Sequence, residues 1–131
     1  LKEAKDLVDK GIGTNMVKIA NGNINDITLE VVLEAAQSKD EVAQDLVKRS
    51  GLALGVRVAY LINMFDVDNV VIGIGAGVQE TSFIEFVRQS ADKFMNENKK
   101  NRVKIEPGQL GKEAGSVGAA LVCRRELFME V

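Results

Sequence analysis

The sequence predicts an α/β domain that is rich in helix and has few strands. Two short β-branched runs, at residues 70–72 and 103–105, have strand character, and amphipathic stretches of helical period fill most of the remaining chain. The length of 131 residues suits one domain over residues 1–131, and a hydrophobic content of 46% is enough for one core.

The N-terminal part of the chain predicts short helical segments. A helix over residues 1–8 has its apolar side chains at helical spacing. A helical turn begins at Thr14 or Asn15, and a further helix covers residues 29–37 with Thr28 as its N-cap.

The longest predicted helix runs from Ser38 to about Met64, because Ser38 and Glu41 have the spacing of a capping box. Gly51 and Gly55 lie in its interior, where each glycine costs ~1 kcal/mol relative to alanine. Either another element approaches this face closely and offsets the cost, or the helix kinks at Gly51. The residues expected to face the core are Val42, Leu46, Val47, Ala53, Leu54, Val58, Leu61 and Ile62.

The second half alternates strands and helices. Residues 70–72 predict a strand that is buried on both faces, and a helix over 82–96 follows with a Ser-x-x-Glu capping box. The basic tract 96–102 predicts a solvated helix end, and the strand 103–105 precedes a last helix over 112–128. Two strands do not make a stable sheet on their own. Further strands have therefore been missed, or they lie before residue 1.

The composition excludes several kinds of site. The chain has no histidine, which excludes a Ser-His-Asp triad, a histidine metal ligand and a histidine pH switch. The single cysteine, Cys123, excludes an internal disulfide and a cysteine metal site, and it suits a reducing compartment.

The net charge and the hydropathy pattern also restrict the partners. A net charge of −2 gives no electrostatic reason to expect nucleic acid or an acidic membrane as the partner. No apolar run approaches the ~20 residues of a membrane span, so we expect a soluble, cytoplasmic protein. Because the sequence starts at Leu1 without a methionine or a signal-peptide pattern, we expect it to be part of a longer protein.

A glycine cluster after the first strand is the candidate ligand site. Gly73, Gly75 and Gly77 lead to a helix that begins at Ser82, so a ligand could approach the backbone and a phosphate could meet free N–H groups. Val78 stands where a dinucleotide-binding motif needs glycine or alanine, and no Lys-Ser or Lys-Thr of a Walker loop follows. The alternative is a glycine-rich turn with a structural role only.

No other set of residues in the sequence indicates a catalytic function. The small residues of segment 110–120 form a smooth helix face that suits packing or a pocket wall, and Asp66 and Asp68 suit a turn. The arginines at 124–125 suit the C-terminal end of a helix, and Cys123 lacks a histidine that could activate it. We therefore assign no catalytic residue and no metal ligand.

The order of these segments resembles the ROK family (repressors, open reading frames and sugar kinases). The family typically shows an alanine pair before a Gly-Asp-x-x-Ala step, a helix ending in Leu-Ile-Asn, an Asn-Pro turn, a strand into Gly-Gly-Gly, and an Ala-Gly-x-x-Gly-Ala-Ala helix. The resemblance covers most of the chain from about residue 28. The matching segments here are residues 35–43, Gly55, residues 61–65, residues 70–73, and residues 110–120.

The resemblance implies the C-terminal part of an RNase H-like, actin-like ATPase domain. In the family's kinases the glycine turn lies beside the adenosine, a role that would fall on Gly73, Gly75 and Gly77. The family's phosphate-binding Asp-x-Gly-x-Thr, catalytic Asn-Asp pair and zinc motif would all lie before Leu1. The resemblance therefore implies no cofactor and no kinase activity for residues 1–131 alone, whereas a parent protein would have sites for ATP and zinc upstream.

The departures from the family pattern bear on the choice between regulator and kinase. Ile74 stands where a glycine is usual, Ala76 resembles an insertion and Asp68 replaces the turn proline, which argues against ATP binding. The segments 27–30 and 121–128 resemble family regulators.

The resemblance thus implies a bacterial, sugar-responsive transcriptional regulator. A sugar or sugar phosphate would bind through upstream residues, DNA would bind through an upstream domain, and no membrane partner is expected. The alternatives are the C-terminal half of an ATP-dependent sugar kinase of the glucokinase type, or a purely structural oligomerisation module. An open strand edge also predicts a homo-oligomer.

Overall fold

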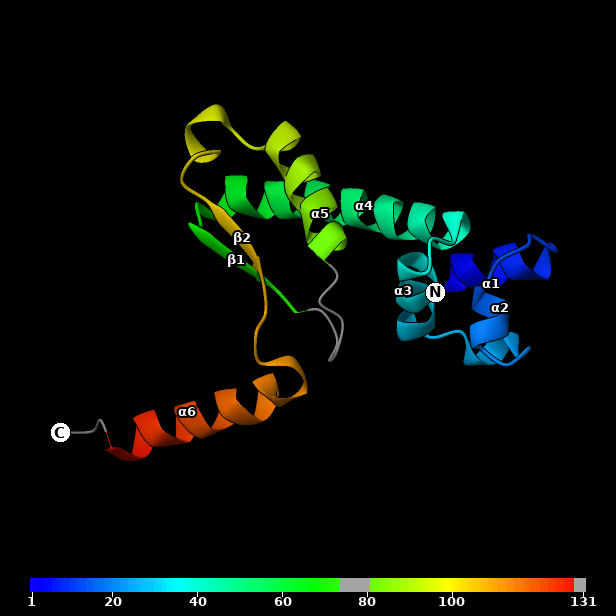
Figure 1. The fold of residues 1–131 in the computed structure, drawn as a ribbon. Coiled ribbons are helices and arrows are strands. Elements are labelled where there is room, and N and C mark those ends of the chain that lie inside the picture. Colours follow the sequence, from blue (N-terminus) through cyan, green and yellow to red (C-terminus); the bar gives the residue numbers. More distant parts are fainter. Residues whose placement is uncertain (74–80, 129–131) are drawn as a thin grey trace.

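The structure is a computed structural model, and it describes residues 1–73 and 81–128. It is a helix-rich mixed α/β chain with two parallel strands, as the sequence predicts (Figure 1). The helices are α1 (Lys2–Asp9), α2 (Met16–Ile19), α3 (Leu29–Gln37), α4 (Glu41–Phe65), α5 (Thr81–Phe94) and α6 (Ala114–Phe128). The strands are β1 (Asn69–Ile72) and β2 (Lys104–Pro107), and short 3-10 turns cover Ile24–Asp26, Glu97–Lys99 and Gly111–Glu113.

The long helix α4 joins two groups of elements (Figure 1). Helices α1, α2 and α3 gather near its first half, whereas α5 and the two strands lie along its second half. Helix α6 lies apart from both groups at the C-terminal end of the chain. The described chain therefore has two separate packing centres along one helix.

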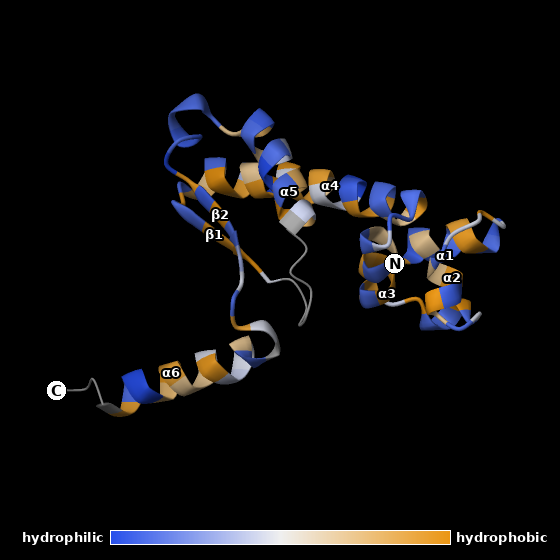
Figure 2. Ribbon diagram, in the orientation of Figure 1, coloured by the Kyte–Doolittle hydropathy of each residue, from blue (hydrophilic) through white to orange (hydrophobic). Residues whose placement is uncertain are grey.

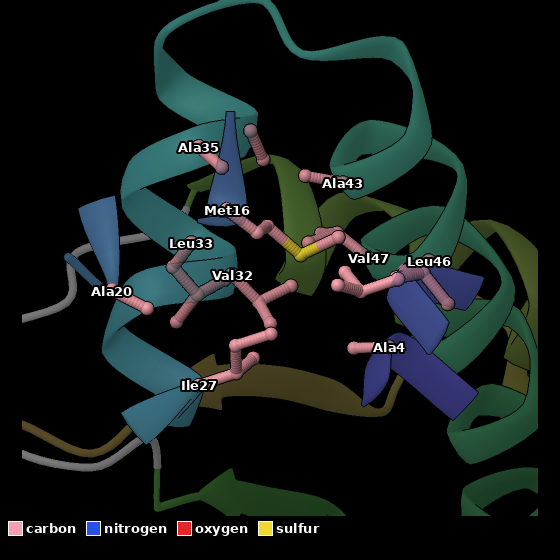
Figure 3. Packing of buried hydrophobic residues seen from close by; sticks show 12 residues of the cluster. Ala4, Met16, Ala20, Ile27, Val32, Leu33, Ala35, Ala43, Leu46 and Val47 are labelled. Carbon is pink, nitrogen blue, oxygen red and sulfur yellow. The ribbon is translucent and has the colours of Figure 1, made fainter. Parts of the chain in front are cut away.

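The first packing centre lies among α1, α2, α3 and the first half of α4. Met16 and Ile27 are its largest fully buried side chains, and Met16 lies between the facing side chains of α3 and α4 (Figure 3). A thioether side chain without branches fills an irregular gap of this kind well. The other members shown in Figure 3 by name are Ala4, Ala20, Val32, Leu33, Ala35, Ala43, Leu46 and Val47.

The two glycines of α4 allow α5 to lie against it. A Cβ atom on Gly55 would stand 2.4 Å from the carbonyl oxygen of Val87, and one on Gly51 would stand 2.8 Å from Cβ of Phe86. Both distances are shorter than a van der Waals contact, so only glycine permits this spacing of the helices. The prediction of a close approach along this face is confirmed. Of the residues expected to face the core, Ala53 and Leu61 are wrong, because both are exposed.

The second packing centre lies beneath the sheet. Val58 and Ile62 of α4, Val87 and Ala91 of α5, and Ile105 of β2 are buried together. The strands pair in parallel, with Val70 opposite Ile105 and Ile72 opposite Pro107. Val71 points to the opposite face and is 68% exposed, so burial of this strand on both faces is wrong for the described chain.

The start of α4 differs from the predicted capping box. Asp40 is its N-cap and accepts a hydrogen bond from the backbone N–H of Ala43 at 2.8 Å, whereas Ser38 ends α3. Lys39 lies between the two helices at a φ of 63°, a left-handed conformation that favours glycine. Thr28 caps α3 as predicted, through the N–H of Val31. Helix α5 starts at Thr81, so Ser82 lies inside it and is not its N-cap.

The end of α4 is closed by a buried lysine. The Nζ of Lys99 donates to the carbonyl of Ile62 at 3.0 Å and lies 2.8 Å from Oδ1 of Asp66, while the residue is only 8% exposed. The prediction of a solvated tract is therefore wrong at this residue. Lys99, together with Arg102, holds the pKa of the Asp66 carboxyl below its ordinary value. The ammonium group satisfies a carbonyl at the helix terminus, where a positive charge also favours the helix dipole.

Helix α6 carries much of its apolar surface exposed. Figure 2 shows hydrophobic and hydrophilic residues along it, and Leu121, Val122 and Leu127 are all more than half exposed. Among the described residues, no helix is both long enough and apolar enough to cross a lipid bilayer.

Candidate functional site

The glycine cluster falls partly outside the described residues. Gly73 follows β1 directly, and a Cβ atom placed on it would meet nothing within 4 Å. Gly73 is also not among the described glycines with a positive φ. Gly75 and Gly77 lie in residues 74–80, outside the described part of the chain. The assignment of a nucleotide to these three glycines therefore stays a prediction.

A pocket lies near the first turn of α5, the helix that follows the glycine cluster in the chain. We call it the junction pocket, because its walls come from α3, α4 and α5. It has a volume of about 470 Å³, which is within the range of small-molecule sites. Its lining residues are Ala36, Gln44, Asp45, Val47, Lys48, Ser82 and Phe86.

The lining of the junction pocket combines an aromatic ring with a few polar groups. Asp45 is already engaged, since its carboxylate lies 2.7 Å from Nε of Arg49 one turn further along α4. Gln44 uses its side-chain N–H to donate to the carbonyl of Ala36 at 3.1 Å. The lining residues include one cation, Lys48, and one aromatic ring, Phe86. This set suits a small, partly planar ligand with a polar or anionic group, and it contains no acid–base pair.

Lys48 and the start of α5 favour the same sign of ligand charge. The first N–H groups of a helix have no intrahelical acceptors and carry the positive end of its dipole. Thr81 and Ser82 form the first turn of α5, and Ser82 lines the junction pocket. An anionic group at this place would meet favourable potential from both sources.

The carboxylate with the densest hydrogen bonding lies away from this pocket. Asp40 accepts hydrogen bonds from the N–H of Asn15 at 2.6 Å, from the N–H of Ala43 at 2.8 Å, and from the hydroxyl of Thr14 at 3.1 Å. Burial alone would raise the pKa of Asp40, but these hydrogen bonds to the charged form outweigh it and lower the pKa below its ordinary value. Asp40 thus ties the α2 region to the start of α4, which is a structural role.

The remaining candidate residues do not form a set of metal-ligating side chains in the described chain. No group of three or more histidine, cysteine, aspartate or glutamate residues clusters within residues 1–73 and 81–128. Asp68 pairs with Nε of Arg102 at 2.6 Å, so it belongs to the ion-pair group that follows α4. Cys123 is exposed on α6. A Cβ atom placed on Gly115 or Gly118 of α6 would meet nothing within 4 Å, so the small-residue face packs on no described neighbour there.

Sequence reasoning missed the junction pocket because its residues come from three helices, and α5 is separated from α3 and α4 by β1 and the segment that follows it. Gln44 and Lys48 are one helical turn apart on α4, beside the buried Val47, and this is a weak local signal. Nothing local indicates that Phe86 of α5 completes the same pocket. The Asp40 network was missed for the same reason, since Thr14 lies 26 residues earlier in the chain.

Comparison with known protein families gives a match over most of the chain. The model of the family described as "ROK family" matches residues 11–126 of the chain. This range contains the whole junction pocket, the Asp40 network and both strands. No curated protein matches the chain.

Proposed function

Because the chain belongs to the ROK family, we propose that it is the C-terminal effector-binding and oligomerisation part of a sugar-responsive transcriptional regulator. The family includes both regulators and sugar kinases, so the choice between them depends on the residues of this chain. The observation that carries the proposal is the altered glycine turn, where Ile74 stands at a usual glycine and Ala76 resembles an insertion.

The C-terminal segment supports the same choice. Residues 124–128, Arg-Arg-Glu-Leu-Phe, resemble the ending of family regulators, and so does the Ile-Thr-Leu-Glu of residues 27–30. In the structure the latter segment forms the N-terminal cap and first turn of α3, through Thr28. The third departure from the family pattern is Asp68, which replaces the turn proline. It does not favour either function, because its ion pair with Arg102 gives it a structural role.

The proposal also covers the fold of the domain to which this chain belongs. Two parallel strands joined through α5, with α4 packed on α5, are compatible with one part of an RNase H-like, actin-like domain. In such a regulator the sugar or sugar phosphate would bind mainly through upstream residues, and DNA would bind through a separate upstream domain. This division agrees with the small net charge of −2.

An ATP-dependent sugar kinase of the glucokinase type is the second candidate function. The observation that favours it is the junction pocket, because its volume of about 470 Å³ and its position beside the start of α5 suit a nucleotide base. Under the regulator proposal this pocket is a remnant of such a site and takes no ATP.

The full coding sequence that contains this segment distinguishes the two functions. We expect a winged helix-turn-helix upstream of residue 1, together with a degraded Asp-x-Gly-x-Thr motif. Sequencing the gene upstream of Leu1 is the measurement. An intact Asp-x-Gly-x-Thr phosphate loop near the first residues of the protein, without a DNA-binding domain, would contradict the regulator and support the kinase.

A further inference from the structure

The outer edge of β2, which faces away from β1, is a place where another strand could add to the sheet. The N–H groups of Lys104 and Gly108 donate to β1, at 2.8 and 2.9 Å. Because the backbone groups of a strand alternate in direction, those of residues 103, 105 and 107 point away from β1. Outward backbone groups are a template for pairing with another chain, and the β-branched Val103 and Ile105 suit such pairing.

Both ends of this edge are closed by the backbone itself. The N–H of Val103 donates to the carbonyl of Lys99 at 3.1 Å, so it is not available to an added strand. Pro107 has no N–H group, and proline is accordingly found at the edges of sheets. Ile105 lies between these two positions. Its N–H and C=O are therefore the groups to which an added strand would have to bond.

The side chain of Arg88 closes the middle of the edge. It reaches over from α5, and its Nε donates to the carbonyl of Ile105 at 2.8 Å. Nη1 of the same guanidinium lies 3.7 Å from Oε2 of Glu85, which is one turn earlier on α5. A donor bonded to the Ile105 carbonyl stands where the N–H of an added strand would have to stand. Arg88 thus occupies both the acceptor and the space beside it.

Charged side chains surround the same place. Residues of α5, of β2 and of the segment between them line a hollow of about 280 Å³. The charged residues of its lining are Arg88, Asp92, Lys100, Lys104 and Glu106. An added strand would remove water from these groups, and burial of a charge without a new partner is unfavourable. The hollow therefore also disfavours strand addition at this edge.

We propose that Arg88 is a gatekeeper residue, which prevents other chains from adding a strand to β2. The ends of the edge are closed by backbone groups, whereas the carbonyl in its middle is occupied by this one side chain. All of these contacts are made within residues 85–108, so the inference requires no residue outside the described chain. It holds equally for a regulator and for a kinase.

Replacing Arg88 with methionine tests this role in the full-length protein that contains the chain. Methionine keeps an unbranched side chain with high helix propensity, but it has no charge and no N–H donor. We expect Arg88→Met to aggregate beyond the assembly state of the unmodified protein, at a temperature below the melting temperature of the variant. Light scattering and thioflavin T fluorescence, which both rise when strands add to one another, measure the aggregation.

Two further variants separate the hydrogen bond from the loss of charge. Lys93→Met is the matched control, since it removes the same charge from an exposed position of α5. Arg88→Lys keeps the charge and a donor on a side chain long enough to reach the carbonyl. We expect both variants to behave like the unmodified protein. No aggregation of Arg88→Met, or equal aggregation of Lys93→Met, would overturn the proposal.

Hydrogen exchange shows whether the new contact lies at β2. In the Arg88→Met aggregate the amide of Ile105 should become protected, while α4 and α5 keep their protection. Loss of protection in α4 and α5 would overturn the proposal, because the aggregate would then arise from unfolding. The unmodified protein gives a test that needs no variant to fold. There the amide of Ile105 should exchange faster than that of Lys104, and a protected Ile105 amide would show that a strand already occupies the edge, which would also overturn the proposal.

Discussion

Replacing Gly55 with alanine will lower the free energy of unfolding by about 3 kcal/mol, the upper part of the usual range for overpacking. The new Cβ atom would stand 2.4 Å from the carbonyl oxygen of Val87 and 2.6 Å from Cβ of Ser90. The first of these is backbone, so α4 and α5 must separate, and their contact is the most extensive between any two elements described. The higher helix propensity of alanine offsets only ~1 kcal/mol of this loss.

Two matched substitutions show whether the clash is the cause. A Cβ atom in Gly51→Ala would stand 2.8 Å from Cβ of Phe86 and 3.1 Å from the carbonyl oxygen of Phe83, and both distances are longer than the 2.4 Å at Gly55, so we expect a smaller loss. Gly118→Ala in α6 meets nothing within 4 Å and should cause no loss. Urea unfolding followed by circular dichroism measures all three. Equal stability of the Gly55 and Gly118 variants would show that the helices do not approach as described.

Replacing Asp40 with alanine will lower the free energy of unfolding by about 3 kcal/mol, because an N-cap is lost and buried N–H groups lose their acceptor. The residue is 8% exposed and accepts from Asn15, Ala43 and Thr14 at once. The comparison variant is Thr28→Ala, which removes the cap of α3 but only one hydrogen bond, of 3.5 Å. We expect about 1 kcal/mol for that loss. Similar losses for the two variants would contradict the role of the wider Asp40 network.

The contribution of Asp40 also depends on pH. Its pKa is lower in the folded chain than the ordinary value of 3.8, since the folded state stabilises the charged form. The stabilisation is therefore fully present above the unfolded pKa and is lost as the pH falls through the folded pKa. We expect the difference in stability between the unmodified chain and Asp40→Ala to be constant near neutral pH and to shrink in acid. A difference that grows in acid would contradict this sign.

Local patterns in the sequence predicted the elements well. Apolar spacing located α3 and α4, β-branched runs located the two strands, and the unfavourable Gly51 and Gly55 indicated that another element lies close. These signals work because each depends on residues within one or two turns of each other. Gly51 and Gly55 are the exception. Their unfavourable helix propensity indicates that another element lies close to them, but it does not identify that element.

The errors occurred where distant residues decide a local structure. Ser38 has a suitable capping spacing, but Asp40 is the cap because Thr14 and Asn15 also hold its carboxylate. In the sequence Lys99 resembles a solvated lysine. In the structure it donates a hydrogen bond to a carbonyl at the end of α4, 37 residues earlier in the chain.

The candidate site shows the same limit of local patterns. The glycine turn was visible in the sequence, but the junction pocket needs α3, α4 and α5 to be assembled before Phe86 and Lys48 line one cavity. Periodicity identified the buried side of α4 near this pocket, through Val47, without indicating which polar neighbours share it.

The regulator proposal is tested most directly by asking whether the junction pocket takes ATP. The chain has no tryptophan, so Phe86→Trp introduces a single fluorescent reporter into the pocket, and Tyr60→Trp on the exposed side of α4 is the matched control. Titration with magnesium ATP should leave the emission of both variants, and the melting temperature of the full-length protein that contains this chain, unchanged. A saturable change in the Phe86→Trp emission that is absent from the control, with a rise in melting temperature comparable to that of a family kinase, would contradict the regulator and identify a nucleotide site.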